Sequence, residues 1–134
     1  MVVDDNLEFL SGVELTLEME GFDVWTATNG KEALEELGFA FLKQSQEDEN
    51  SRLPDLILAD IMMPQMDGFA LLSHIMEAYP HIPVIIITGY STPQMEQLAK
   101  DGGAVGYIEK PFLVEELAKK ILTTLSVTTK KDRF

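Results

Sequence analysis

Two short apolar runs constrain the fold of this chain more than any other feature. Residues 55–60 (DLILAD) and 82–87 (IPVIII) are continuous rather than alternating in their apolar parts. A strand with one buried face alternates apolar and polar residues, whereas a strand of a parallel sheet is buried on both faces and reads as an unbroken apolar run. We therefore predict that both runs are strands of a parallel sheet.

The rest of the chain alternates between helix-like and strand-like patterns. Apolar residues recur at helical spacing in five segments, and further short segments are rich in strand formers. The expected helices cover residues 7–20, 68–79 and 93–100; one more begins at 31 and runs toward the polar stretch 44–51, and the last begins at about 112. Besides the two apolar runs, the expected strands are one that ends at Asp4, one over residues 22–27 and one over residues 104–108. Five strand–helix repeats predict an α/β fold with a single doubly wound, five-stranded parallel sheet and right-handed crossovers. The five helices are expected to be distributed over the two faces of this sheet.

The charge of the chain is strongly negative and unevenly distributed. Ten Lys and Arg residues against 23 Asp and Glu residues give a formal net charge of −13 at pH 7. Residues 1–118 hold 22 of the acids and 5 of the bases, whereas residues 128–134 form a basic tail. Negative charge repels phosphate backbones and anionic lipids, so we expect the chain to bind neither nucleic acid nor membranes.

Three absences narrow the class of protein further. The sequence has no cysteine, which excludes disulfides, thiolate nucleophiles and zinc–thiolate sites. It shows no signal peptide and no apolar run long enough to span a bilayer. We therefore expect one cytoplasmic domain over residues 1–127, followed by a frayed C-terminal tail over residues 128–134.

Polar side chains are expected where four of the strands end. Asp4-Asp5 follows the first strand, Asp60 the third, Thr88 the fourth and Lys110 the fifth. In open parallel sheets, ligands bind outside the carboxyl ends of the strands, near the switch in strand order. The topology would bring three carboxylates, one hydroxyl group and one ammonium group to the same edge of the sheet.

These residue types suit phosphoryl chemistry. Three adjoining carboxylates repel one another unless a cation lies among them, and oxygen donors favour a hard cation such as Mg²⁺. An ammonium and a hydroxyl group can hold phosphoryl oxygens, and a carboxylate can be the nucleophile that becomes an acyl phosphate. The sequence has neither a Gly-x-x-x-x-Gly-Lys phosphate loop nor a dinucleotide fingerprint after its first strand.

Four motifs carry a family resemblance. Residues 2–6 (VVDDN), 60–68 (DIMMPQMDG), 88–89 (TG) and 110–112 (KPF) occur in this order over nearly the whole chain. Together they resemble the receiver domain of two-component response regulators, the CheY-like superfamily. The resemblance implies a flavodoxin-like sheet with strand order 2-1-3-4-5 and a phosphoacceptor domain of two-component signal transduction.

The resemblance also implies an acceptor and a metal site. Asp60 would accept a phosphoryl group from a phosphohistidine of a sensor histidine kinase, in a Mg²⁺-dependent reaction. Asp5 would bind Mg²⁺ directly, and Asp4 directly or through water. Asp60 and the backbone carbonyl of Met62 would be further ligands of the metal.

A second set of implied roles concerns the switch. Lys110, preceding Pro111 in a cis peptide bond, and the hydroxyl group of Thr88 would contact the phosphoryl oxygens. Thr88 and Tyr107 would form the switch, with the aromatic ring turning inward as Thr88 moves toward the phosphoryl group. The face of the fourth helix, fifth strand and fifth helix would then bind an output protein or effector domain.

Two features modify this pattern. The segment over residues 31–54 is longer than the family usually has there, and we expect an extended second helix with residues 47–51 mobile. Met62 and Tyr90 occupy positions that flank the phosphoryl group in this family. We expect their bulk to shield the group and to make phosphorylated Asp60 long-lived.

Two other functions fit parts of the sequence. A metal-dependent phosphohydrolase would use Asp60 as a turnover nucleophile, but it usually has an Asp two residues later, where this chain has Met62. A phosphorylation-independent interaction domain would not need the phosphorylation residues, all of which are present. We therefore expect a self-phosphorylating and autodephosphorylating switch rather than a turnover enzyme.

Overall fold

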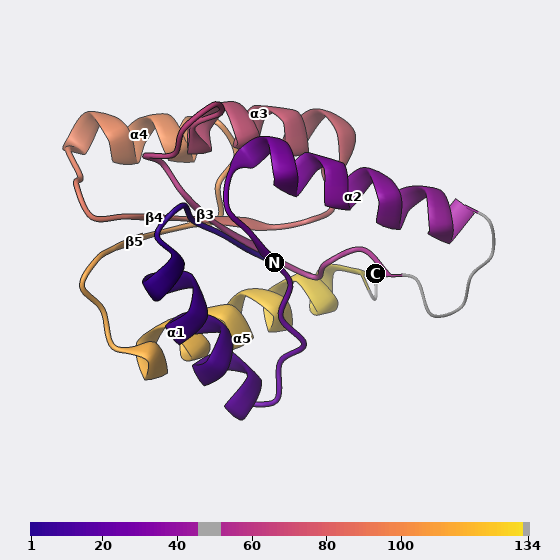
Figure 1. Cartoon of the computed structure of the whole chain (residues 1–134), viewed down its shortest axis with the longest axis horizontal. Coiled ribbons are helices and arrows are strands. Elements are labelled where there is room, and N and C mark those ends of the chain that lie inside the picture. The colour runs from indigo at the N-terminus through magenta and orange to yellow at the C-terminus, as the bar shows by residue number, and fades with distance from the viewer. Residues whose placement is uncertain (46–51, 133–134) are drawn as a thin grey trace.

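The chain forms one parallel sheet of five strands in the order β2-β1-β3-β4-β5, as seen in a computed structural model that describes residues 1–45 and 52–132 (Figure 1). Strands and helices alternate along the chain. They are β1 (Val2–Val3), α1 (Leu7–Met19), β2 (Thr26–Ala27), α2 (Gly30–Ser45), β3 (Ile57–Asp60), α3 (Gly68–Ala78), β4 (Val84–Thr88), α4 (Pro93–Asp101), β5 (Gly106–Glu109) and α5 (Val114–Asp132). The predicted α/β class and the strand order implied by the resemblance are both confirmed.

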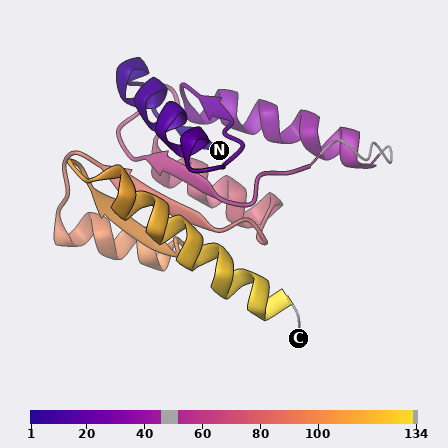
Figure 2. The same cartoon turned by 90° about the horizontal axis from the view of Figure 1, so that it is seen from below.

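Helices cover both faces of the sheet (Figures 1 and 2). Buried residues of α2, α3 and α4 pack with one set of strand residues into a core on one face. Buried residues of α1 and α5 pack with the other set into a second core on the opposite face. The molecule is therefore a three-layer sandwich with a separate apolar core on each side of the sheet.

The continuous apolar runs are explained by these two cores. In β3, Ile57 and Ala59 belong to the core under α2, α3 and α4, whereas Leu58 between them belongs to the core under α1 and α5. In β4, Ile86 belongs to the core under α2, α3 and α4, and Ile85 belongs to the core under α1 and α5. Because successive strand residues point to opposite faces, both faces need apolar side chains and no alternation remains.

The second strand is shorter than its sequence pattern suggested. Residues 22–27 alternate as predicted, but only Thr26 and Ala27 pair, in parallel with Val2 and Val3 of β1. β2 lies at the edge of the sheet, and its single neighbour β1 presents two residues to it. Phe22, Val24 and Trp25 contribute side chains to the two cores without being paired strand residues, although Trp25 O accepts a hydrogen bond from Val2 N–H at 2.8 Å.

The helices begin where the sequence provides caps. Asn6, Asp67 and Thr92 precede α1, α3 and α4, and each side chain accepts a hydrogen bond from a backbone N–H of the first turn. After α1, the chain turns at Gly21, whose φ of +96° is easily adopted only without a side chain. In the part of the chain that the structure describes, no helix is both long and apolar enough to cross a membrane.

Two helices extend the sequence expectations. α2 reaches Ser45, as the long segment suggested, and the expectation of mobility at residues 47–51 lies outside the described residues. α5 continues to Asp132 instead of fraying after Val127. Residues 128–132 contain neither Gly nor Pro, so nothing in their sequence ends the helix.

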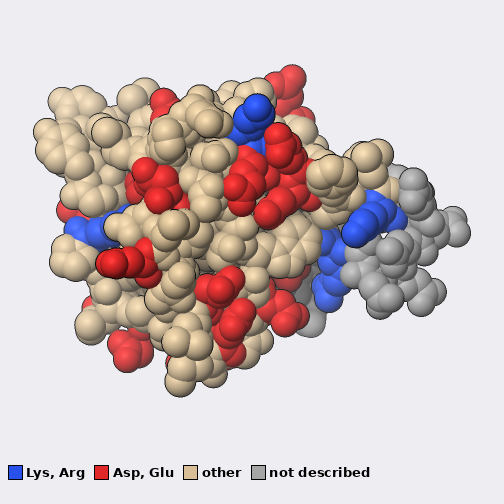
Figure 3. All heavy atoms as spheres, viewed as in Figure 1, with Lys and Arg blue, Asp and Glu red and all other residues tan. Residues whose placement is uncertain are grey.

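The surface reflects the acidic composition. On the face shown in Figure 3, Asp and Glu side chains are spread over much of the surface, and the fewer Lys and Arg side chains lie in small groups. A surface of this kind presents no continuous positive patch on this face for a polyanion.

Candidate functional site

The candidate site lies at the carboxyl edge of the sheet, where four strands deliver polar side chains. Asp4 directly follows β1, Asp60 is the last residue of β3, Thr88 is the last of β4, and Lys110 directly follows β5. The sheet register aligns these strand ends, since Asp60 pairs with Ile87. Residues separated by up to 106 positions in the sequence therefore meet at one edge.

Three carboxylates form the centre of the site. One oxygen each of Asp4, Asp5 and Asp60 lies within 4.8 Å of the other two. Asp4 has no exposed surface and Asp60 is 6% exposed, whereas Asp5 faces solvent. The structure thus brings together the three aspartates that the sequence pattern singled out, two buried and one open to the outside.

The ammonium group of Lys110 lies against two of these carboxylates. Its Nζ donates to Asp4 Oδ2 at 2.7 Å and to Asp60 Oδ2 at 3.2 Å. Burial alone would lower the pKa of Lys110, but the hydrogen bond and charge of Asp4, together with Asp60, outweigh burial and raise this pKa. The lysine is therefore charged and held inside the site.

The ionised form of the Asp60 carboxyl group is destabilised relative to its protonated form. Burial and the charge of Asp4 raise the pKa of Asp60 above its ordinary 3.8, and Lys110 and the Met62 N–H offset only part of this effect. That N–H donates to Asp60 Oδ1 at 3.2 Å. The site consequently has more negative charge than its own groups can balance.

The backbone around the aspartates fixes their positions. Asn6 N–H donates to Asp4 Oδ1 at 2.9 Å. Behind Asp60, Gly68 N–H donates to Ile61 O at 2.9 Å, and a Cβ at Gly68 would meet Asp60 O at 2.3 Å. Only a glycine permits the start of α3 to approach the end of β3 so closely.

Thr88 bonds the loop that follows it rather than the carboxylates. Its Oγ1 donates to Tyr90 O at 2.9 Å and accepts from Tyr90 N–H at 3.2 Å. In the residue after Tyr90, the hydroxyl group of Ser91 lies 2.6 Å from the hydroxyl group of Tyr107. The half-buried Tyr107 on β5 is thereby joined to the loop between β4 and α4.

The remaining predicted residues lie around the rim. The side chains of Met62 and Tyr90 are 62% and 67% exposed. The Lys110–Pro111 peptide bond is cis, as the resemblance implied. Asp67 caps α3 by accepting from Ala70 N–H at 2.8 Å and has no place among the clustered carboxylates.

Sequence reasoning missed two residues that contact this site. The ring of Phe9 on α1 lies under the Lys110 ammonium, and Ser91 is the partner of Tyr107. Both follow a recognised residue by three or four positions, Phe9 after Asp5 and Ser91 after Thr88. Because Asp5 precedes α1 and Thr88 ends β4, neither separation is a helical repeat, and no sequence period pointed to these contacts.

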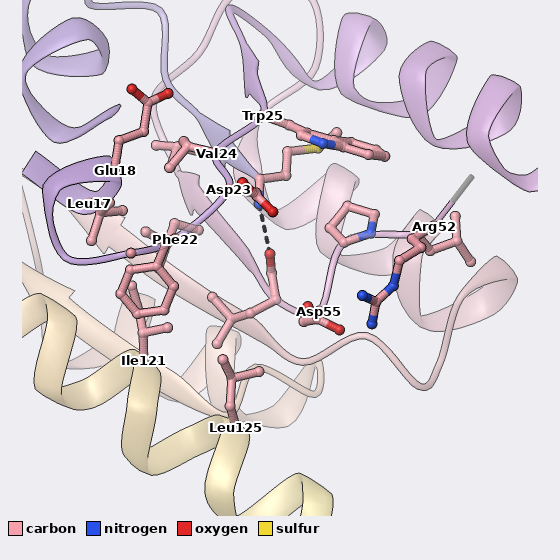
Figure 4. Close-up of a pocket in the computed structure, with 17 residues that line it drawn as sticks. Leu17, Glu18, Phe22, Asp23, Val24, Trp25, Arg52, Asp55, Ile121 and Leu125 are labelled. Atoms are coloured by element: carbon pink, nitrogen blue, oxygen red, sulfur yellow. Dashed lines mark hydrogen bonds between the residues drawn. The ribbon is translucent and has the colours of Figure 1, made fainter. Parts of the chain in front are cut away.

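A separate groove of about 870 Å³ lies at the opposite ends of the strands (Figure 4). It is lined by the end of α1, the start of β1, the segments before β2 and β3, and two residues of α5, Ile121 and Leu125. The Met1 amine donates to Leu56 O at 2.9 Å at this groove, the bond drawn as a dashed line. The groove contains none of the clustered aspartates.

These features are those of a known family, and the chain belongs to it: the model of the response regulator receiver domain matches residues 1–122. The chain is 36% identical over 125 residues to the DNA-binding transcriptional regulator NtrC of Escherichia coli (strain K12). That alignment covers 93% of this chain and 24% of NtrC, so the chain spans about a quarter of this relative.

Solved structures agree with this assignment. A response regulator receiver domain protein (CheY-like) from Methanospirillum hungatei JF-1 matches with a TM-score of 0.83 and 30% identity, over 97% of this chain and 94% of that one. The receiver domain of NtrX from Brucella abortus matches with a TM-score of 0.78 and 31% identity, over 93% and 96%. The recognised resemblance to two-component receiver domains is therefore confirmed.

Proposed function

We propose that this receiver domain accepts a phosphoryl group on Asp60 from a sensor histidine kinase, depends on Mg²⁺, and thereby changes its binding to an output partner. The observation that carries the proposal is the position of the Asp60 carboxylate, which lies beside the buried Asp4 and accepts a hydrogen bond from the ammonium of Lys110 at 3.2 Å. A nucleophilic carboxylate beside a fixed cation is the arrangement that acyl phosphate formation requires.

The donor set fits a magnesium ion. Asp4, Asp5 and Asp60 offer oxygen atoms within 4.8 Å of one another, and the raised pKa of Asp60, caused by burial and by Asp4, reflects uncompensated negative charge. These three residues, with the backbone carbonyl of Met62, would hold the ion. When bound, the ion would neutralise charge on the carboxylates and the phosphoryl oxygens.

Phosphoryl transfer would proceed at the Asp60 carboxylate. One of its oxygens forms a bond to phosphorus while the bond from phosphorus to the histidine nitrogen breaks, which leaves an acyl phosphate and the histidine. Lys110, held by Asp4, would donate to a phosphoryl oxygen and stabilise the charge of the group. Asp4 stays fixed through the bonds from Lys110 and Asn6.

The switch would begin at Thr88. To donate to a phosphoryl oxygen, its hydroxyl group must release Tyr90 O, which it bonds in this structure. Release frees the loop that carries Ser91, and Ser91 is bonded to Tyr107. A charge change at Asp60 would thus reach Tyr107 on β5, within the α4–β5–α5 face that we propose for the output partner.

The cellular setting is also a proposal. A histidine kinase donor places the chain in the cytoplasm. DNA binding is part of the name of the longer NtrC relative. For this chain, with its net charge of −13, the absence of direct nucleic-acid binding stays a prediction.

The proposal is tested by incubating the protein with a small phosphodonor and Mg²⁺ and measuring the intact mass. A single phosphate adduct is expected in wild type and in Asp101→Asn, an exposed aspartate of α4, and none in Asp60→Asn. The adduct should also be absent when EDTA replaces Mg²⁺. An unmodified wild-type protein would overturn the proposal and favour an interaction domain that works without phosphorylation.

A further inference from the structure

The ammonium group of Lys110 has an aromatic neighbour besides its two carboxylate partners. Its Nζ lies 4.0 Å from the centroid of the Phe9 ring, over the face of that ring. Phe9 is in the first turn of α1, directly after the loop that carries Asp4 and Asp5. The lysine from the end of β5 is therefore bounded by carboxylates on one side and by an aromatic face on another.

The Phe9 ring is itself fixed in place. The ring of Phe112 meets it edge to face, with centroids 5.9 Å apart and planes at 87°. Both rings are partly buried against the core under α1 and α5. Phe112 follows Lys110 by two residues, so the short segment from Lys110 to Phe112 contacts Phe9 with an ammonium group and with a ring.

This arrangement restricts a flexible side chain without occupying its donors. A lysine has a four-carbon stem, and its ammonium group can point in many directions when nothing holds it. The negative face of an aromatic ring attracts a cation but accepts no conventional hydrogen bond from it. The N–H groups of Lys110 therefore stay available for Asp4, Asp60 and an incoming oxygen.

We propose that Phe9 is a positioning residue that holds the Lys110 ammonium between Asp4 and Asp60. Its importance for reactivity rests on the proposed phosphorylation of Asp60. Phe9 acts through Lys110, because its ring contacts the ammonium group. A role in packing alone would be met equally well by leucine, which fills buried positions of the same helix at Leu10 and Leu17.

The test compares Phe9→Leu, which removes the aromatic face, with Phe9→Tyr, which keeps it. Phe22→Leu is the matched control, since Phe22 is also partly buried against the same core but follows the C-terminal end of α1 and lines the groove. Two quantities are measured in the whole protein: the rate of phosphorylation at saturating Mg²⁺ by a small phosphodonor, and the NMR shift of the Lys110 ε-methylene protons.

The expected results separate positioning from packing. Phe9→Leu should slow phosphorylation about threefold to tenfold, in line with a cation–π contact at a half-buried site. Phe9→Tyr and Phe22→Leu should keep the wild-type rate. The upfield ring-current shift of the Lys110 protons should disappear in Phe9→Leu alone.

The same experiment distinguishes failure of the inference from failure of the proposed function. A wild-type rate and an unchanged Lys110 shift in Phe9→Leu, or an equal loss of rate in Phe9→Tyr, would overturn the role of Phe9. Absence of any phosphorylation in wild type would overturn the proposed function. The Lys110 shift would then still decide whether Phe9 positions the ammonium group.

Discussion

The ammonium group of Lys110 lies 2.7 Å from Oδ2 of Asp4, a carboxylate with no exposed surface, and joins the ends of the first and last strands. The side chain of Lys110 itself is 20% exposed. A buried carboxylate is costly unless a cation or several donors compensate it, so the lysine supports the fold as well as the site.

Removing the charge of Lys110 should therefore destabilise the protein. Lys110→Met keeps much of the aliphatic stem but leaves Asp4 buried without its cation, and we expect the free energy of unfolding to fall by about 3 kcal/mol. Urea unfolding followed by circular dichroism measures this. Lys100→Met on α4, where the lysine is exposed, is the control and should change stability by less than about 0.5 kcal/mol. Equal effects of the two substitutions would contradict the assignment.

Neutralising Asp60 should have the opposite effect in the absence of metal. Its pKa is raised by burial and by Asp4, so the ionised form is disfavoured in the folded protein. Asp60→Asn should raise the free energy of unfolding by about 1 kcal/mol at pH 7 in EDTA. Adding Mg²⁺ should stabilise wild type more than the variant, because bound ligands favour the folded state.

The difference in the free energy of unfolding between Asp60→Asn and wild type should depend on pH with a defined sign. A carboxyl group with a raised folded-state pKa supports folding at low pH, and that support is lost as the pH rises through the folded-state pKa. The advantage of Asp60→Asn should therefore shrink as the pH falls toward 3.8, the ordinary pKa of Asp60. An advantage that grew toward low pH would show that repulsion at Asp60 is not its cause.

Gly68 should tolerate no side chain. A Cβ there would lie 2.3 Å from Asp60 O and 2.8 Å from Ile61 Cα, so Gly68→Ala should cost about 3 kcal/mol and displace Asp60. Gly38→Ala in α2 is the matched control, since its Cβ would meet nothing within 4 Å. The free energy of unfolding of this control should rise by about 0.5–1 kcal/mol, because alanine has a higher helix propensity than glycine. Thermal unfolding of the two variants should shift in opposite directions.

The bond between Ser91 and Tyr107 should appear as a coupling energy. Ser91→Ala and Tyr107→Phe each remove one of two hydroxyl groups that lie 2.6 Å apart, and each should cost about 1 kcal/mol. The double variant should cost about as much as either single one, a coupling near 1 kcal/mol. Tyr90→Phe, with an exposed ring, is the control. Additive losses would show that the two hydroxyl groups act independently.

The amine of Met1 should make stability depend on pH near neutrality. Burial lowers the pKa of this amine from 8.0 to about 6. The unfolded chain then binds more protons between these values, so the free energy of unfolding should fall by about 1–2 kcal/mol as the pH drops from 8 to 6. One added residue before Met1 replaces the amine by an amide and should remove this part of the dependence. A pH profile unaffected by the added residue would contradict the assignment.

The sequence allowed prediction of the features that depend on local pattern. The runs in residues 55–60 and 82–87 identified β3 and β4 because both faces of these strands are buried. Asp4, Asp60, Thr88 and Lys110 could be placed at one edge because parallel strands share their direction.

Features that depend on three-dimensional proximity could not be predicted in this way. The ladder of β2 is limited by the length of its neighbour β1, and the 22–27 pattern carries no information about that neighbour. The contact between Phe9 and Lys110 joins residues that no helical or strand period relates. The bond from Thr88 to Tyr90 depends on the path of a loop.

The shortness of β1 has a consequence for the metal site. β1 pairs through two residues with each neighbour, whereas β3 and β4 pair through four. Asp4 and Asp5 directly follow β1, so local opening of this strand would carry two of the three clustered carboxylates away from Asp60 in one event. A cation held by all three would oppose that opening, and amide hydrogen exchange in β1 would slow as the cation binds. The occupancy of the cation site and the lifetime of the closed state of β1 are then two measures of one equilibrium.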